Sequence, residues 1–331
     1  MKISSILSAL GVTAAIGLTA MAVGCAPIKK GEYTEGAEYI ACDDGFRKIL
    51  KQEIEVFEYQ YPKAFILPSY MSENECIDSL KAGKCNLIIV TRELNEAERE
   101  NIKKEQKRVV RQKCIAVDAV ALIVNKDNPV GLLTLNEIRD ILMGKITTWR
   151  QLAVNDTSKI KIVFDNEGSS TVNYMREKFL PKGMTLSQNP NTFAQKDNED
   201  VFEVVKRDKN VLGIISVSWL GENLESTKMP VDKKLKDLEN YNDTIDVRFT
   251  DAIKVLKVRD NEDPVGYLPY QAYINSGQYP LFRKVYAIST ASNSTLAHSF
   301  YAFLTGAVGQ KIIALTGIMP YNVQPRVVQI Q

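Results

Sequence analysis

The chain has very few of the side chains on which most enzymes rely for acid–base or metal chemistry. Its 331 residues include one histidine, His298. This residue lies in an amphipathic C-terminal pattern, where a packed or surface histidine is the ordinary case, so a Ser-His-Asp triad and a histidine metal site have little support. The motif G-x-x-x-x-G-K-[ST] is absent, which argues against nucleotide hydrolysis. We therefore expect neither enzymatic activity nor a cofactor.

The chain also lacks a large net charge and the cysteine spacings that are typical of metal sites. The 42 Lys and Arg residues nearly balance the 40 Asp and Glu residues, which gives no argument for nucleic acid as a partner. Of the five cysteines, none belongs to a C-x-x-C pair or to a Cys/His spacing typical of zinc. In an exported protein the remaining four can form disulfides, and the sequence leaves their pairing open: Cys42, Cys76, Cys85 and Cys114.

After the N-terminus, no apolar run approaches the length needed to cross a bilayer. Lys2 precedes an apolar run at residues 3–23, and residues 22–25 read Ala-Val-Gly-Cys, which resembles a bacterial lipoprotein signal. We predict that residues 1–24 are a signal peptide, that Cys25 is lipidated and that residues 25–38 form a tether. A plain secretory signal and an uncleaved anchor are the alternatives. All three export the protein, and lipidation would hold it at the membrane surface.

Strand and helix patterns alternate along the rest of the chain, which predicts an α/β fold. Capping boxes mark helix starts at Ser72 and Thr134, and Asn95 with Glu98 marks the start of another helix. A strand pattern at residues 279–288 would return toward the first half, so two α/β units would enclose a cleft. The other apolar strand patterns are at residues 38–42, 64–67, 86–90, 115–124, 160–164 and 211–217.

Residues 165–172 join a strand pattern to a helix pattern, and their sequence is Asp-Asn-Glu-Gly-Ser-Ser-Thr-Val. The first N–H groups of a helix lack internal partners and carry partial positive charge, and small hydroxyl side chains add donors. We interpret this junction as an anion-binding seat. The alternative is that Ser169 or Ser170 only caps the helix.

Similar junctions occur earlier in the chain. Residues 44–46 follow a strand, and Gly45 there lets the backbone come close to a ligand, while Ser72 begins the next helix. Thr91 and Arg92 follow the buried strand at residues 86–90, at the edge where open parallel sheets bind ligands. Alternatively, Arg92 forms a surface ion pair with a neighbouring residue or helix.

Together with the lipoprotein signal, these motifs resemble the phosphate-binding lipoproteins of ABC transporters. The similarity begins near residue 39 and extends to the C-terminus, and the order and spacing of the motifs carry it. It implies a two-lobed periplasmic-binding-protein (type II) fold, in which each lobe is a mostly parallel sheet flanked by helices. Residues 39–118 and 285–331 would form lobe 1, and residues 119–284 would form lobe 2. The matching segments are residues 44–46, 89–94, 118–125, 168–171, 213–219 and 269–272.

The resemblance also implies a function. The protein would be a monomer that captures inorganic phosphate between its lobes and delivers it to an ABC permease. Sulfate, molybdate or tungstate are alternative ligands, and a sensor or interaction lipoprotein that has lost tight binding is an alternative function. The resemblance implies that Gly45, Phe46, Ser72 and Thr91 of lobe 1 bind the ligand together with Ser169, Ser170 and Thr171 of lobe 2. We add four further candidate ligand-binding residues from the same junctions: Asp44, Arg92, Asp165 and Gly168.

Two positions depart from the family pattern. Better-studied phosphate binders carry an aspartate after the lobe 1 strand and an arginine before the Gly-Ser-Gly-Thr loop, whereas Arg92 and Asp165 stand in the reverse arrangement here. We hypothesise that Arg92 still faces Asp165 across the cleft. Asp165 would then accept a hydrogen bond from a protonated phosphate oxygen, which sulfate lacks. Against this, Asp43, Asp44 and Glu167 crowd negative charge near the seat.

Overall fold

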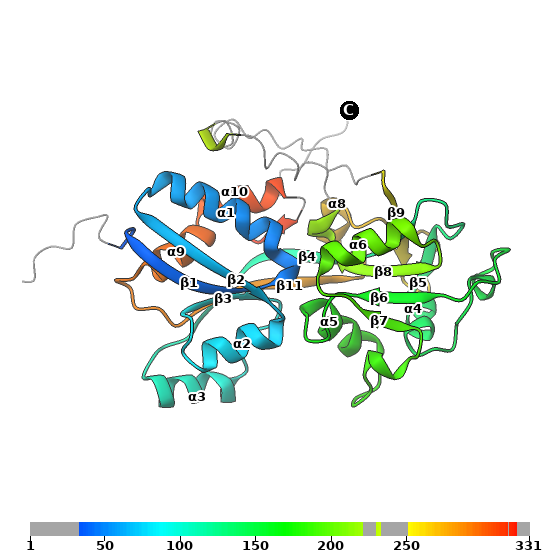
Figure 1. The fold of residues 1–331 in the computed structure, drawn as a ribbon, viewed down its shortest axis with the longest axis horizontal. Helices are drawn as coiled ribbons and strands as arrows, with labels where there is room; N and C mark the ends of the chain where they lie inside the picture. The colour runs from blue at the N-terminus through cyan, green and yellow to red at the C-terminus, as the bar shows by residue number, and fades with distance from the viewer. Residues whose placement is uncertain (1–32, 221–229, 233–250, 317, 323–331) are drawn as a thin grey trace, which may run out of the picture.

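The computed structural model describes residues 33–220, 230–232, 251–316 and 318–322. Two α/β halves lie side by side, and two long strands cross between them (Figure 1). The signal peptide and Cys25 lie outside the described residues. Within the described part of the chain, no helix combines the length and the apolar character needed to span a bilayer.

The first half is built on three parallel strands. β1 (Gly36–Asp43) pairs with both β2 (Ala64–Met71) and β3 (Leu87–Val90). β1 begins at Gly36 and therefore includes the last three residues of the segment that we assigned to the tether. The helices of this half are α1 (Arg47–Gln60), α2 (Glu73–Lys81), α3 (Glu96–Gln106), α9 (Leu296–Leu304) and α10 (Ala307–Leu315).

The second half repeats this plan. β6 (Lys161–Phe164) lies parallel between β7 (Thr192–Ala194) and β8 (Val211–Ser216). The strands β5 (Leu132–Thr134) and β10 (Lys257–Arg259) form a separate two-stranded sheet. The helices are α4 (Leu135–Leu142), α5 (Ser170–Phe179), α6 (Asn198–Arg207) and α8 (Gln271–Asn275).

β4 (Arg111–Asn125) and β11 (Phe282–Ser289) connect the halves. β11 is antiparallel to β3 and β4, and β4 is antiparallel to β8. The prediction of mostly parallel sheets therefore holds for the three-strand cores, but β4 and β11 join these cores into one mixed, 10-stranded sheet. The short strands β9 (Ile253–Val255) and β12 (Met319–Pro320) also pair with β4.

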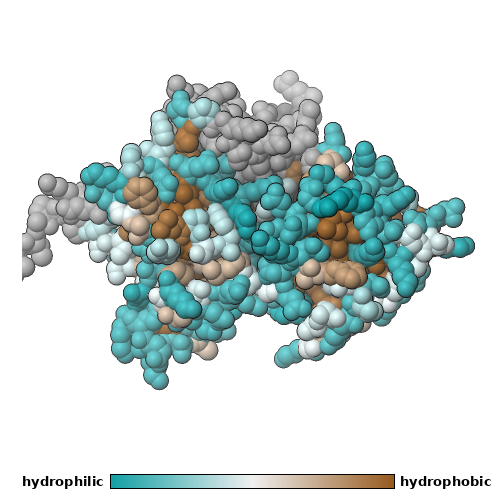
Figure 2. Space-filling view, in the orientation of Figure 1, coloured by the Kyte–Doolittle hydropathy of each residue, from teal (hydrophilic) through white to brown (hydrophobic). Residues whose placement is uncertain are grey.

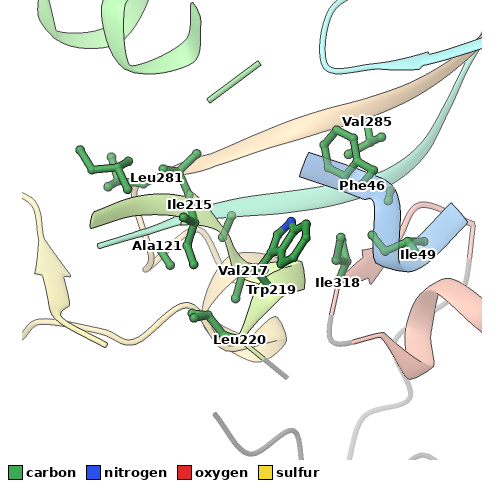
Figure 3. Packing of buried hydrophobic residues seen from close by; sticks show 14 of the residues in the cluster. Phe46, Ile49, Ala121, Ile215, Val217, Trp219, Leu220, Leu281, Val285 and Ile318 are labelled. Atoms are coloured by element: carbon green, nitrogen blue, oxygen red, sulfur yellow. The ribbon is translucent and has the colours of Figure 1, made fainter. Parts of the chain in front are cut away.

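One hydrophobic cluster extends through both halves. It includes Phe46 and Val285 together with Ile215, Val217 and Trp219 (Figure 3). Both crossing strands contribute to this cluster, and residues 114–124 of β4 are all buried. Since burial of apolar area is the main favourable term in folding, the core holds the strand ends of the two halves close together. Trp219 belongs to η4 (Val217–Trp219), which directly follows β8.

The local predictions match these elements closely. Each apolar strand pattern corresponds to an observed strand, and capping boxes are formed at Ser72, Asn95 and Thr134. Asp44–Phe46 forms a short 3-10 helix, η1, between β1 and α1. The predicted junctions between strands and helices are therefore confirmed, and they lie where the two halves meet (Figure 1).

Candidate anion-binding site between the lobes

The side chain of Asp43 lies at the end of β1 and is completely buried. Its Oδ1 atom accepts hydrogen bonds from the Gly45 backbone N–H (3.0 Å) and the Ser170 hydroxyl (2.8 Å). Its Oδ2 atom accepts a hydrogen bond from the Ser170 backbone N–H (3.0 Å). Gly45 and Ser170 belong to different halves of the molecule, so donors from both halves converge on one carboxylate group.

The start of α5 explains why the Ser170 N–H is available. Ser169 is the N-cap residue, and its hydroxyl oxygen accepts a hydrogen bond from the Val172 N–H at 3.2 Å. The Ser169 hydroxyl also donates to Asp165 Oδ1 at 2.5 Å. Ser169 therefore caps the helix, as the capping alternative predicts. Ser170, at the first helical position, has no partner within the first turn for its N–H and directs it at Asp43.

Gly45 leaves no room for a side chain. A Cβ atom built on Gly45 would lie 2.8 Å from Asp43 Oδ1, 3.8 Å from Arg283 Nη2 and 3.9 Å from Ser170 Oγ. The absence of a side chain thus lets the backbone approach the carboxylate. The Gly45 carbonyl oxygen in turn accepts hydrogen bonds from two donors of the other half, Ser218 Oγ at 2.8 Å and Trp219 Nε1 at 3.0 Å.

A second buried carboxylate, Glu73 of α2, makes a similar set of contacts. Its Oε1 atom accepts hydrogen bonds from the backbone N–H and the hydroxyl of Thr91, both at 2.7 Å. Its Oε2 atom accepts one from Asn173 Nδ2 of α5 at 3.0 Å. Both donors of Thr91 are thus bound to a carboxylate of the chain itself, and Glu73 links the two halves as Asp43 does.

Arg283 of β11 was not among the predicted site residues, although it supplies a buried positive charge. Its Nε and Nη2 atoms both lie 3.0 Å from Asp118 Oδ2, and Nη2 also lies 3.4 Å from Thr171 Oγ1. Among the residues that the structure describes, none accepts a hydrogen bond from Arg283 Nη1. A signal was present, because Asp118 interrupts the longest apolar strand pattern and a buried carboxylate needs a cation.

Negative charge dominates the electrostatics of this region. Burial, followed by repulsion from Glu73, raises the pKa of Asp43 to about 6. Burial, followed by repulsion from Asp43, raises the pKa of Asp165 to about 7. Burial also raises the pKa of Asp118, although the Arg283 guanidinium opposes that shift. Asp43 and Asp165 therefore repel each other, and both titrate closer to neutral pH than exposed aspartates do.

The structure brings several of the remaining predicted residues together. Gly168 lies against Ser72, because a Cβ on Gly168 would be 3.0 Å from Ser72 Oγ. The Phe46 ring has the Arg283 guanidinium 5.5 Å from its centroid. Asp44 is buried, and its Oδ1 atom pairs with Arg47 at the start of α1, 2.7 Å from Nε and 2.5 Å from Nη2.

Arg92 and Asp165 do not face each other, so that hypothesis is wrong. The two terminal nitrogens of Arg92 donate to the carboxylate of Glu98 in α3, at 2.8 and 2.9 Å. Asp165 is fully buried and accepts from Ser169 and from Asn198 Nδ2 (3.0 Å). The alternative of a surface ion pair with a nearby helix is correct for Arg92. Arg283, and not Arg92, is the cation that lowers the pKa of Asp165.

The four cysteines whose pairing the sequence left open are free thiols in the structure. All four are buried. Burial is the main reason why the pKa of each thiol is raised above its ordinary value. Thiols of this kind react slowly, because the thiolate is the reactive form.

The fold and the convergent donors define a two-lobed binding protein. A family model described as a PBP superfamily domain matches residues 32–308, and the chain belongs to this family. The phosphate-binding protein PstS of Pseudomonas aeruginosa is 24% identical over 97% of this chain and 95% of that protein.

Solved structures share the fold. A putative phosphate ABC transporter substrate-binding protein from Clostridium perfringens, solved with bound phosphate, has a TM-score of 0.67 and 23% identity; the match covers 87% of this chain and 100% of that chain. An ABC-type phosphate transport receptor from Vibrio cholerae has a TM-score of 0.61 and 21% identity, with 85% and 99% covered. The predicted two-lobed periplasmic-binding-protein fold is confirmed.

Proposed function

We propose that the protein is an extracytoplasmic solute-binding lipoprotein that captures inorganic phosphate between its lobes and delivers it to an ABC permease. The observation that carries this proposal is the convergence of three donors from both lobes on a single carboxylate: Gly45 N–H, Ser170 N–H and Ser170 Oγ. A donor set that holds two carboxylate oxygens also suits two oxygens of a tetrahedral oxyanion.

Further contacts near this seat support an anionic ligand. Arg283 carries a buried charge, and its Nη1 atom has no acceptor within the described part of the chain. Thr171 adds a hydroxyl beside Arg283. Asp165, with a pKa of about 7, is the group that would accept a hydrogen bond from a protonated phosphate oxygen. Relatives named for phosphate binding favour phosphate among the oxyanions.

The lobe boundaries and the anchor belong to the same proposal. Along β4, pairing with β11 ends at Ala119 and pairing with β8 begins at Val120. This change of partner supports a boundary between lobe 1 (39–118 with 285–331) and lobe 2 (119–284). Cleavage before Cys25, followed by lipidation, would hold the monomeric receptor at the membrane surface.

Calorimetry on the mature protein tests the proposal. We expect wild-type protein to bind phosphate, and we expect Ser170→Ala to bind it roughly tenfold more weakly, because one hydrogen bond to a charged ligand is lost. Ser276→Ala, which changes a serine at the end of α8, is the matched control and should bind like wild type. Sulfate, molybdate and tungstate titrations identify the preferred oxyanion. Absence of heat with phosphate in wild-type protein would contradict the proposal.

A second candidate is a sensor or interaction lipoprotein that has kept the fold and lost tight binding. One observation favours it: Asp43 and Glu73 already accept the hydrogen bonds that Gly45, Ser170 and Thr91 would offer to a ligand. Such a protein would give no heat with any of the four oxyanions.

A further inference from the structure

We infer that Asp43 is a resident competitor for the oxyanion seat, so that an incoming anion binds only by displacing this carboxylate. The inference rests on the proposed function, because it concerns the affinity of the same seat. It makes Asp43 a residue that limits how tightly the seat binds an anion.

The first argument is hydrogen-bond capacity. A backbone N–H group carries one hydrogen, as does a serine hydroxyl. The N–H groups of Gly45 and Ser170 and the Ser170 hydroxyl are all engaged by Asp43, at distances of 2.8 to 3.0 Å. An oxyanion that uses these donors at full strength must therefore take them from Asp43.

The second argument is space. Asp43 has no exposed surface. Its Oδ1 atom would lie only 2.8 Å from a Cβ atom on Gly45, which is closer than a Cβ atom tolerates. The carboxylate thus fills the volume next to the donors, and a phosphate oxygen cannot lie beside it within hydrogen-bonding distance of the same groups.

The third argument is charge. Glu73 repels Asp43, and Asp43 repels Asp165. Arg283 is the cation that lowers the pKa of both aspartates. A doubly charged anion placed beside an ionised Asp43 would add to this repulsion. When the Asp43 carboxylate leaves the donors, the negative charge nearest to the ligand moves away from it. Replacement of the carboxylate by the anion is therefore favoured over occupancy of the seat by both.

The fourth argument concerns the link between the lobes. Asp43 belongs to β1, and Ser170 begins α5 in the other lobe. The Asp43 carboxylate therefore makes the same bridge between lobes that a bound oxyanion would make. A ligand that replaces Asp43 regains these hydrogen bonds but must first break them, which lowers its apparent affinity.

Asp43→Asn tests the inference in the full mature chain. The asparagine has the same size, but in either amide orientation its NH₂ group would face a backbone N–H donor, of Ser170 or of Gly45. It is also uncharged, so it competes less well for the seat than the carboxylate does. We expect this variant to bind phosphate at least tenfold more tightly than wild type in calorimetry. Asp78→Asn is the matched control, since it makes the same charge change on the exposed face of α2 and should bind like wild type.

Two outcomes separate this inference from the proposed function. If wild type binds phosphate and Asp43→Asn binds it equally or more weakly, Asp43 is not a competitor, and the proposed function stands. If wild type, Asp43→Asn and Asp43→Ser all fail to bind any of the four oxyanions, the proposed function is wrong and this inference fails with it. Asp43→Ser is a second variant in case the asparagine impairs folding. Thermal unfolding verifies that both variants are folded.

Hydrogen exchange provides a readout that needs no phosphate. The Ser170 N–H is held by Asp43 Oδ2 at 3.0 Å, so its exchange should be faster in Asp43→Asn than in wild type or Asp78→Asn. Unchanged exchange at Ser170 would show that Asp43 does not hold this donor in solution, and it would overturn the inference.

Discussion

At the scale of single residues, the identity of a charged side chain does not reveal its partner. Arg92 occupies a position that favours ligand binding, at the end of a buried strand, yet its guanidinium pairs with Glu98. Arg283 drew no attention in the sequence, yet it is buried with Asp118 beside Thr171. The difference follows from which neighbouring element each side chain reaches.

The pairing of Arg92 gives a prediction that contrasts with the original hypothesis. Arg92→Ala should change the affinity for phosphate by less than about threefold, because the residue belongs to a partly exposed ion pair with α3 and such pairs contribute little. Calorimetry with Ser170→Ala as the sensitive reference tests this. A tenfold loss of affinity in Arg92→Ala would place its guanidinium at the ligand after all.

At the scale of elements, side chains a few residues apart determine where helices begin. The helices α2, α3 and α4 begin with complete capping boxes, at Ser72, Asn95 and Thr134. In each box the N-cap side chain accepts from the backbone of the third helical residue, whose own side chain accepts from the N-cap backbone. These contacts need no tertiary partner, so the sequence alone identifies them.

The capping box of α4 can be tested away from the proposed site. Thr134→Ala removes the acceptor of the Glu137 N–H (3.1 Å) and should lower the free energy of unfolding by about 1 kcal/mol. Urea denaturation measures the change. Thr157→Ala, in an exposed loop, is the control and should change stability by less than about 0.5 kcal/mol. Equal stability of the two variants would show that the box contributes nothing.

At the scale of the whole molecule, assembly of the two lobes buries carboxyl groups that the unfolded chain exposes. The pKa values of Asp43 (about 6) and Asp165 (about 7) are raised mainly by burial. Burial also raises the pKa of Glu53 of α1, whose oxygens have no partner among the described residues. Through these groups the folded protein binds more protons than the unfolded chain between about pH 5 and pH 7. This range lies above the one in which the carboxyl groups with lowered pKa values titrate.

It follows that the protein should become more stable when the pH falls from 8 to 5. A raised folded-state pKa contributes stability that is complete below the unfolded-state pKa and is lost as the pH rises through the folded-state value. Burial lowers the pKa of His298, so the contribution of this one group to stability decreases as the pH falls and opposes the gain. Melting temperatures across this range measure the effect, and Asp43→Asn should reduce it. A melting temperature that decreases when the pH is lowered from 8 to 5 would contradict the prediction.

The sequence by itself determined the strands, the capped helix starts and the small residues at the junctions, since each depends on neighbours within a few positions. Only the tertiary structure decided which charges meet. Asp43 and Ser170 are 127 positions apart, and Asp118 and Arg283 are 165 apart. No local periodicity encodes such pairs, because they form only when the crossing strands bring both lobes together. For the same reason, the donors at Gly45 and Ser170 were predictable, but the carboxylate that they hold was not.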